Sequence, residues 1–156
     1  MKHTFTIIIC IIITEALGFT VGMLTREGTR LYAGTMIKPP FSPPAMLFPV
    51  AWTILYALMG VGVAIVINSA ASAVRTSAVL LFVLQIIFNL SWCFIFVSFR
   101  NYRLALVWIV VLLILSALMM LHFKKISPAA GYMQIPYIVW LVFATYLNAG
   151  VMVLNR

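Results

Sequence analysis

Apolar residues run almost without interruption through five stretches of the chain, and polar residues and prolines gather in the short segments between them. A hydrocarbon core about 30 Å thick is crossed by roughly 20 apolar residues in an α-helix. The pattern therefore predicts an all-α fold, an integral membrane bundle of five transmembrane helices in a single domain, residues 1–156. The expected spans are about 4–24, 44–68, 78–99, 104–123 and 128–154.

The composition also indicates that most of the chain is surrounded by lipid rather than water. Of the 156 residues, 65% are hydrophobic and only 8% are charged, whereas a soluble domain carries about a quarter charged residues. The net charge of +8 comes from cations that stand singly or in pairs between apolar runs, which is typical of anchors at lipid headgroups. These groups are too small to neutralise several phosphates, so no nucleic-acid partner is expected.

The connection at residues 25–43 is the one substantial loop. It ends in the run Pro39-Pro40-Phe41-Ser42-Pro43-Pro44. Prolines fix φ and bias the residues before them towards extended backbone, so we expect a semi-rigid strap. Ser42 is a candidate cap for the second helix, and Pro43 and Pro44 suit its opening turn. Such a loop could cover a cavity as a lid or simply connect two helices.

Five spans place the two termini on opposite sides of the membrane. The side of the N-terminus collects Lys2, Arg75, Lys124 and Lys125. The other side collects Arg26, Arg30, Lys38, Arg100, Arg103 and Arg156. Because cytoplasmic loops carry an excess of Lys and Arg, this distribution predicts that the long loop and the C-terminus face the cytoplasm.

Few polar groups lie inside the spans. Glu15 falls midway along the first one, and an intramembrane carboxyl is costly enough to be a candidate functional group, or else it is satisfied by a neighbouring helix. Gly18 and Gly22 form a GxxxG motif that could pack against another helix or a second copy of the chain. The spans carry no Ser/His/Asp set, carboxylate pair or metal cluster, so we expect no conventional catalytic site, no metal and no required cofactor.

Three predicted helices each carry a stripe of aromatic side chains, and two of the stripes include an amide. The stripes are Trp52 and Tyr56 on the second helix; Phe88, Asn89, Trp92 and Phe96 on the third; and Tyr137, Trp140, Ala144 and Asn148 on the fifth. Such stripes can serve as interhelical packing and interfacial belts. They can equally line a cavity for a large, flat, apolar ligand.

Four segments in the same order resemble the TspO family, also known as translocator proteins, tryptophan-rich sensory proteins or peripheral benzodiazepine receptors. Residues 31–34 and 38–44 read LYAG and KPPFSPP, like the first loop of that family. Residues 49–60 (PVAWTILYALMG) and 88–92 (FNLSW) resemble its second and third helices. Residues 135–148 (IPYIVWLVFATYLN) resemble its fifth helix. The resemblance covers nearly the whole chain.

The resemblance implies five packed helices, often dimeric, with a pocket below the first loop that binds porphyrin or haem-type tetrapyrroles. It also implies an alternative activity, the light-dependent degradation of protoporphyrin IX with Trp52 and Trp140 as the catalytic residues. If this chain dimerises, Gly18 and Gly22 are the expected contact. The expected pocket residues are Tyr32, Phe41, Pro43, Trp52, Tyr56, Asn89, Trp92, Phe96, Tyr137, Trp140, Ala144 and Asn148.

This chain departs from the family pattern at several positions. Phe41 stands where the first loop usually has tryptophan, and Trp108 replaces an aspartate of the fourth helix. No Lys or Arg follows Tyr146 until Arg156, so sterol binding through the motif of animal members is not expected. The short ends and the missing sterol motif favour a tetrapyrrole-binding sensor or carrier in a bacterial or archaeal cell membrane.

Overall fold

The computed structural model describes residues 2–155; Met1 and Arg156, the latter counted in the charge prediction, lie outside the described residues. The helices are α1 (Lys2–Leu24), α2 (Arg26–Thr35), α3 (Leu47–Ile67), α4 (Ala73–Cys93), the π-helix η1 (Phe94–Ser98), α5 (Tyr102–Ile126), α6 (Pro128–Tyr132) and α7 (Ile135–Leu154). Five helical stretches are long and apolar enough to cross a membrane. The predicted all-α fold with five spans is confirmed.

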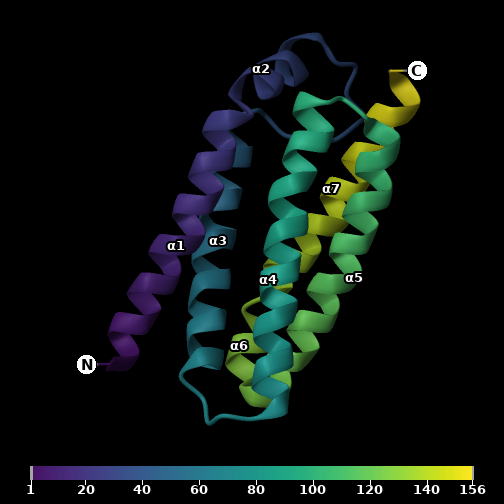
Figure 1. The fold of residues 1–156 in the computed structure, drawn as a ribbon. Helices are drawn as coiled ribbons and strands as arrows, with labels where there is room; N and C mark the ends of the chain where they lie inside the picture. Colours follow the sequence, from purple (N-terminus) through teal and green to yellow (C-terminus); the bar gives the residue numbers. More distant parts are fainter. Residues whose placement is uncertain (1, 156) are drawn as a thin grey trace.

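The five long helices run along one another in a bundle, with α3 partly behind α1 and α7 behind α4 and α5 in the view of Figure 1. The first helix, α1, lies at one edge next to α3, and α4, α5 and α7 form the rest of the bundle. The short helix α2 lies across the end of the bundle where the C-terminus emerges, and the N-terminus lies at the opposite end. An odd number of spans therefore separates the termini as predicted.

The edge helix α1 approaches α3 closely because a glycine stands at the contact. A Cβ atom at Gly60 would lie 2.8 Å from the Cα atom of Ile11, a separation that real side chains do not reach. At the same place the Thr14 hydroxyl donates a hydrogen bond to the carbonyl oxygen of Tyr56, at 2.9 Å. Within a membrane, close packing at small residues and interhelical hydrogen bonds hold helices together, as the hydrophobic effect does in water.

The predicted extended strap is wrong for its first half, because residues 26–35 form the helix α2. That part contains no proline, so nothing in it prevents helical hydrogen bonding. The extended part begins at Met36 and contains the prolines. The predicted cap is also wrong: Ser42 donates to the carbonyl oxygen of Pro39 at 2.7 Å, and α3 begins later, at Leu47.

The remaining strap, residues 36–44, is tied to the C-terminal end of α7. The side-chain amide of Asn155 accepts from the N–H of Ile37 at 3.0 Å and donates to its carbonyl oxygen at 2.9 Å. The hydroxyl of Tyr146 donates to the carbonyl oxygen of Pro40 at 2.9 Å. These bonds hold the strap across the end of the bundle.

The fifth span is broken rather than smoothly kinked. We expected a kink at Pro136, and the structure ends α6 at Tyr132 and begins α7 at Ile135. Proline has no N–H to donate to the carbonyl four residues earlier, and its ring clashes with that carbonyl. For Pro136 the affected residue is Tyr132, which is where α6 ends.

Candidate functional site

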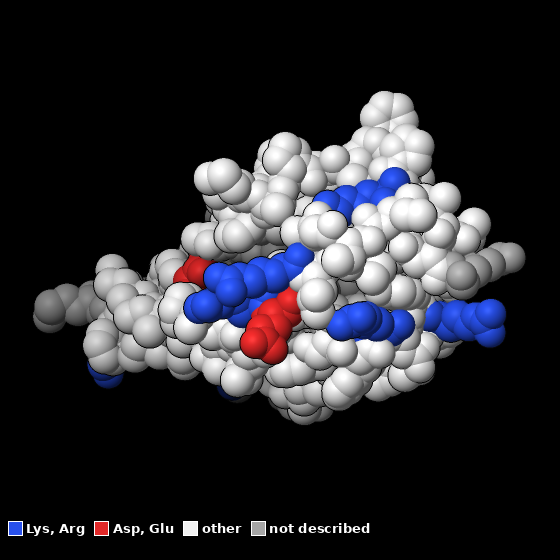
Figure 2. Space-filling view, turned by 90° about the horizontal axis from the view of Figure 1, so that it is seen from above, with Lys and Arg blue, Asp and Glu red and all other residues white. Residues whose placement is uncertain are grey.

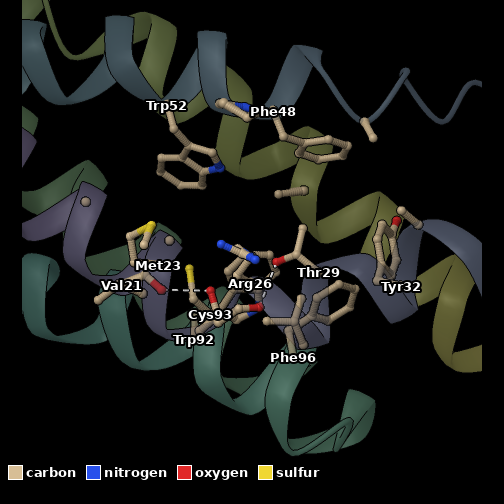
Figure 3. Close-up of a pocket in the computed structure, with 18 of the residues that line it drawn as sticks. Val21, Met23, Arg26, Thr29, Tyr32, Phe48, Trp52, Trp92, Cys93 and Phe96 are labelled. Atoms are coloured by element: carbon tan, nitrogen blue, oxygen red, sulfur yellow. Dashed lines mark hydrogen bonds between the residues drawn. The ribbon is translucent and has the colours of Figure 1, made fainter.

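A cavity of about 520 Å³ lies beneath α2. Its walls come from α1, the first half of α3, the end of α4 with η1, and α7, and α2 and the strap close it from above. Most of the lining atoms belong to apolar side chains, and Figure 3 shows aromatic rings on opposite sides of the space. A concave apolar site with few polar groups is the usual form of a small-molecule pocket.

The aromatic walls are held in place by contacts among the lining rings and with a residue behind them. Trp92 and Phe96 stack with their ring centroids 5.0 Å apart, and Tyr32 from α2 packs on Phe96 at 5.4 Å. The indole N–H of Trp92 donates to the side-chain oxygen of Asn148 at 3.2 Å. On the opposite wall, Trp52 makes no hydrogen bond through its indole N–H within the described residues, which leaves that donor free for a ligand.

Cations gather at the mouth of the cavity. Arg26, Arg30 and Lys38 all line it. Figure 3 draws the guanidinium group of Arg26 pointing into the space, and Figure 2 shows Lys and Arg side chains spread over this end of the molecule with carboxylates beside them. The Lys38 ammonium donates to the carbonyl oxygen of Ala33 at 2.7 Å and lies 5.5 Å from the ring centroid of Tyr32.

The hydroxyl of Tyr32 is neutral at physiological pH. Partial burial raises its pKa above the ordinary value for tyrosine, and the nearby Tyr102 raises the pKa further. A neutral phenol can donate and accept hydrogen bonds at once. The mouth of the cavity therefore combines fixed positive charges with one adaptable hydroxyl.

Seven of the twelve predicted pocket residues line this cavity. They come from α2, the strap, α3, the end of α4, η1 and α7, so segments far apart in the sequence meet here. They are Tyr32, Pro43, Trp52, Tyr56, Trp92, Phe96 and Ala144.

The other five predicted residues lie away from the lining. Asn89 and Tyr137 are buried next to it, where Asn89 accepts from the Tyr56 hydroxyl at 2.6 Å and donates to the Tyr137 hydroxyl at 3.0 Å. Asn148 is buried behind Trp92 and donates to the backbone of Tyr102 at 2.9 Å. These three side chains support the pocket wall.

Trp140 and Phe41 were also predicted to line the pocket, and neither does. Trp140 lies behind Trp52, with ring centroids 6.3 Å apart in an edge-on arrangement, and does not line the cavity. Phe41 is 90% exposed and has a φ of 62°, a strained conformation for a bulky residue. Its ring faces away from the protein surface, so it offers no wall to the cavity.

Several lining residues were not predicted. The helix α2 and the residue before it supply a face of Thr25, Thr29, Tyr32 and Ala33, at the spacing i, i+4, i+7 and i+8 of a helical stripe. That periodicity is visible in the sequence and could have revealed the helix. Phe48, Cys93, Val97 and Leu147 also line the cavity, and no sequence pattern distinguishes them from lipid-facing residues.

The two glycines predicted as a dimer contact both line the cavity. At Gly18 an added Cβ atom would overlap the ring of Tyr56, whereas at Gly22 it would meet nothing within 4 Å. Within the monomer Gly18 thus makes room for a pocket residue. A homodimer through this face stays a prediction.

Glu15 also lines the cavity, at its deeper end. It is partly buried, and Glu27, the second acid of the chain, lies on α2 outside the lining. Within residues 2–155 no group of three or more His, Cys, Asp or Glu side chains could hold a metal ion. The cavity therefore has one acidic group inside and several cations at its mouth.

Known proteins resemble this chain along most of its length. Residues 10–154 match the TspO/MBR family. The chain is 36% identical over 155 residues to the tryptophan-rich protein TspO of Chlorobaculum tepidum, with 99% of this chain and 98% of that protein covered. It is 33% identical to a tryptophan-rich sensory protein of Cereibacter sphaeroides (76% and 73% covered) and 31% identical to the translocator protein of Homo sapiens (87% and 82% covered).

Proposed function

The chain belongs to the TspO/MBR family, and on this premise we propose that it binds a porphyrin or haem-type tetrapyrrole in the cavity below α2, as a membrane sensor or carrier. The observation that carries the proposal is the aromatic, mostly apolar cavity with cations at its mouth. The name of the Cereibacter sphaeroides relative, a sensory protein, supports the sensor role.

The physical basis is burial of a large planar ring. A flat macrocycle between Trp52 and the Trp92–Phe96 stack would remove apolar surface from lipid and water on both faces, and aromatic stacking adds about 0.5–1.5 kcal/mol for each well-placed ring pair. Carboxylates on the ring edge would meet Arg26 and Arg30, since a guanidinium can bind a carboxylate through two parallel hydrogen bonds.

A second function is light-dependent oxidation of bound protoporphyrin IX, with dioxygen as oxidant. Two observations favour it: Trp52 lines the cavity with an indole N–H that makes no hydrogen bond within residues 2–155, and Trp140 lies edge-on behind Trp52, with ring centroids 6.3 Å apart. Such a pair could donate an electron to the photo-excited ring, which passes it to dioxygen to give superoxide. The indole cation radical then takes an electron from the ring, and superoxide adds to the oxidised ring, so that the ring and one dioxygen are consumed together. In this function Trp52 acts directly on the ligand, and Trp140 acts through Trp52.

One titration separates the two functions. Purified protein is titrated with protoporphyrin IX in the dark while tryptophan fluorescence is followed, and porphyrin absorbance is then recorded under illumination. Saturable quenching without a protein-dependent product supports the sensor or carrier. A product that disappears in Trp52→Phe, and that forms more slowly in Trp140→Phe, supports the oxidation. The absence of saturable quenching would refute tetrapyrrole binding.

We further propose that the protein resides in a bacterial or archaeal cell membrane with α2, the strap and the C-terminus on the cytoplasmic side. Among described residues five cations lie at that end and four at the other, and Arg156 adds a sixth by sequence. The excess favours a cytoplasmic location. Reporter fusions to the C-terminus test it: fluorescence of a cytoplasm-dependent reporter supports the proposal, and activity of a periplasm-dependent phosphatase contradicts it.

A further inference from the structure

A second hollow, separate from the cavity, lies at the end of the bundle where the C-terminus emerges. It has a volume of about 400 Å³, and the turn between η1 and α5 and the end of α7 form its walls. Most of its lining surface is polar, and it includes Arg100 and Arg103. We propose that this hollow binds the phosphate group of one anionic phospholipid. The proposal is independent of tetrapyrrole binding.

The two arginines bring positive charge to the hollow without an acid to neutralise it. The chain has only two acidic side chains, Glu15 and Glu27, and neither lines the hollow. Both arginines are exposed, and neither guanidinium group donates a hydrogen bond within residues 2–155. A guanidinium group binds a phosphate through two parallel hydrogen bonds, so the pair favours a phosphate as the occupant.

The start of α5 adds backbone donors to the same place. The side-chain oxygen of Asn101 accepts from the N–H of Leu104 at 3.1 Å. The N–H groups of Tyr102 and Arg103, which also begin this helix of 25 residues, have no acceptor within residues 2–155. Unpaired N–H groups and the positive end of the helix dipole both favour an anion. Here they belong to residues that line the hollow.

The backbone of Arg100 is an independent sign of function. Arg100 follows Phe99, the cap of η1, and has a φ of 52°. Helices often end with a residue in this left-handed conformation, but that residue is usually glycine or asparagine, because a longer side chain makes the conformation costly. Strained residues of this kind gather at ligand sites. An arginine at this position is explained if its guanidinium group has a ligand.

The position of the hollow favours a lipid over a soluble anion. The helix α5 is a membrane span from Tyr102 to Ile126, so Arg103 lies where hydrocarbon gives way to headgroups. Below Arg103, at the spacing i+4, i+7 and i+11 of one helical stripe, the side chains of Val107, Val110 and Ile114 are exposed. A phosphate held in the hollow would therefore continue into acyl chains that lie along this apolar stripe.

Two lipids and four proteins test the site. The lipids are phosphatidylglycerol and phosphatidylcholine with identical acyl chains, added to the protein in detergent, and native mass spectrometry measures the affinity for the first bound lipid. The proteins are the wild type, Arg100→Asn, Arg103→Gln and Lys125→Gln. Asparagine tolerates the left-handed conformation, so Arg100→Asn removes the charge and keeps the turn. Lys125 is an exposed cation at the other end of α5, so its variant is the control for lost charge.

We expect the wild type and Lys125→Gln to bind phosphatidylglycerol about tenfold more tightly than phosphatidylcholine, which is the effect of one hydrogen bond between charged groups. Arg100→Asn and Arg103→Gln should each lose most of this preference. Their affinity for phosphatidylcholine should match that of the wild type, which shows that they are folded. Neither arginine lines the cavity, so neither substitution should change the affinity for protoporphyrin IX.

Three results would overturn the proposal. The first is equal affinity of the wild type for the two lipids. The second is an unchanged preference in either arginine variant, or an equal loss in Lys125→Gln, which would assign the preference to overall charge. The third is complete displacement of phosphatidylglycerol by inorganic phosphate but not by chloride at equal ionic strength, which would assign the hollow to a free anion. Failure of protoporphyrin IX to bind would refute the proposed function and leave this site untouched.

Discussion

At the level of single residues, the centre of the bundle is organised by one buried amide. Asn89 links the hydroxyl groups of Tyr56 and Tyr137, and Tyr137 also donates to the side chain of Gln85 at 2.9 Å. All four side chains are at least 95% buried. The chain of hydrogen bonds joins α3, α4 and α7 directly behind the cavity wall, so the position of Tyr56 in the cavity depends on Asn89.

Replacing Asn89 with leucine should therefore lower stability. The variant loses two interhelical hydrogen bonds and leaves the Tyr56 hydroxyl without its partner, which should cost about 1–3 kcal/mol. Thermal unfolding in detergent measures the change. Asn68→Leu is the matched control, because Asn68 directly follows α3 and its side chain makes no hydrogen bond within the described residues. This substitution should change stability by less than about 0.5 kcal/mol. Equal effects of the two substitutions would contradict the assigned role.

Asn89 also shows which property of a single residue the sequence pattern predicts and which it does not. The stripe on its helix correctly indicates which side faces inward, because helical periodicity fixes direction. Periodicity does not fix depth: Trp92 reaches the cavity, while Asn89, one turn earlier, ends in a hydrogen bond to a tyrosine. Which stripe residues line a cavity depends on the volumes of the facing side chains, and no single helix encodes them.

At the level of elements, the short helix α2 is held over the cavity by its contact with η1. An added Cβ atom at Gly28 would overlap the carbonyl oxygen of Val97, so α2 touches the backbone of the π-helix there. Single-turn π-helices occur frequently at functional sites. The glycine and the π-helix together allow α2 to lie close enough to bring Tyr32 against Phe96.

Substituting Gly28 with alanine should lift α2 from η1 and open the mouth of the cavity. We expect bound protoporphyrin IX to dissociate roughly tenfold faster, equivalent to about 1.4 kcal/mol of lost contact. Stopped-flow fluorescence measures the rate. Gly34→Ala is the control in the same helix, because a Cβ atom there would meet nothing within 4 Å. An unchanged rate in Gly28→Ala, or the same acceleration in Gly34→Ala, would show that α2 does not retain the ligand.

Elements differ in how well the sequence predicts them. The five spans follow from hydrophobicity, which is a local property, and the break before α7 follows from Pro136. The predicted strap did not include the helix α2, because the prolines that favour extended backbone begin only at Pro39, whereas Thr25, Thr29 and Tyr32 before them have helical spacing. The π-helix η1 packs against α2, and the sequence of residues 94–98 gives no local signal for it.

At the level of the whole molecule, the cavity is where the edge helix α1 meets the rest of the bundle. Below the cavity α1 packs closely on α3, and it makes few contacts with α4. The lining comes from both sides of this gap, with Gly22 and Met23 on α1 and Trp92 and Cys93 on α4. A ligand that fills the cavity would join α1 to α4 and so stabilise the whole fold.

Ligand binding should accordingly raise the melting temperature in detergent. At a protoporphyrin IX concentration 100 times the Kd, the stabilisation should be about 2.7 kcal/mol, or roughly 5–10 °C for a chain of this size. The Gly22→Phe variant is the control: its new side chain has free space at the Cβ position and should fill the cavity. It should keep its fold and lose the shift. A shift of equal size in Gly22→Phe would place the ligand elsewhere.

The two hydrogen bonds between Asn155 and Ile37, which fasten the strap to the end of α7, have a consequence for the synthesis of the protein. The two partners are 118 residues apart, so at about 5–20 residues per second the ribosome needs roughly 6–24 s after Ile37 to produce Asn155. During that interval α1 and α2 exist without the hydrogen bonds that fasten the strap. The strap over the cavity is thus synthesised well before the residue that fastens it, so a chain interrupted between Ile37 and Asn155 would lack the closed site.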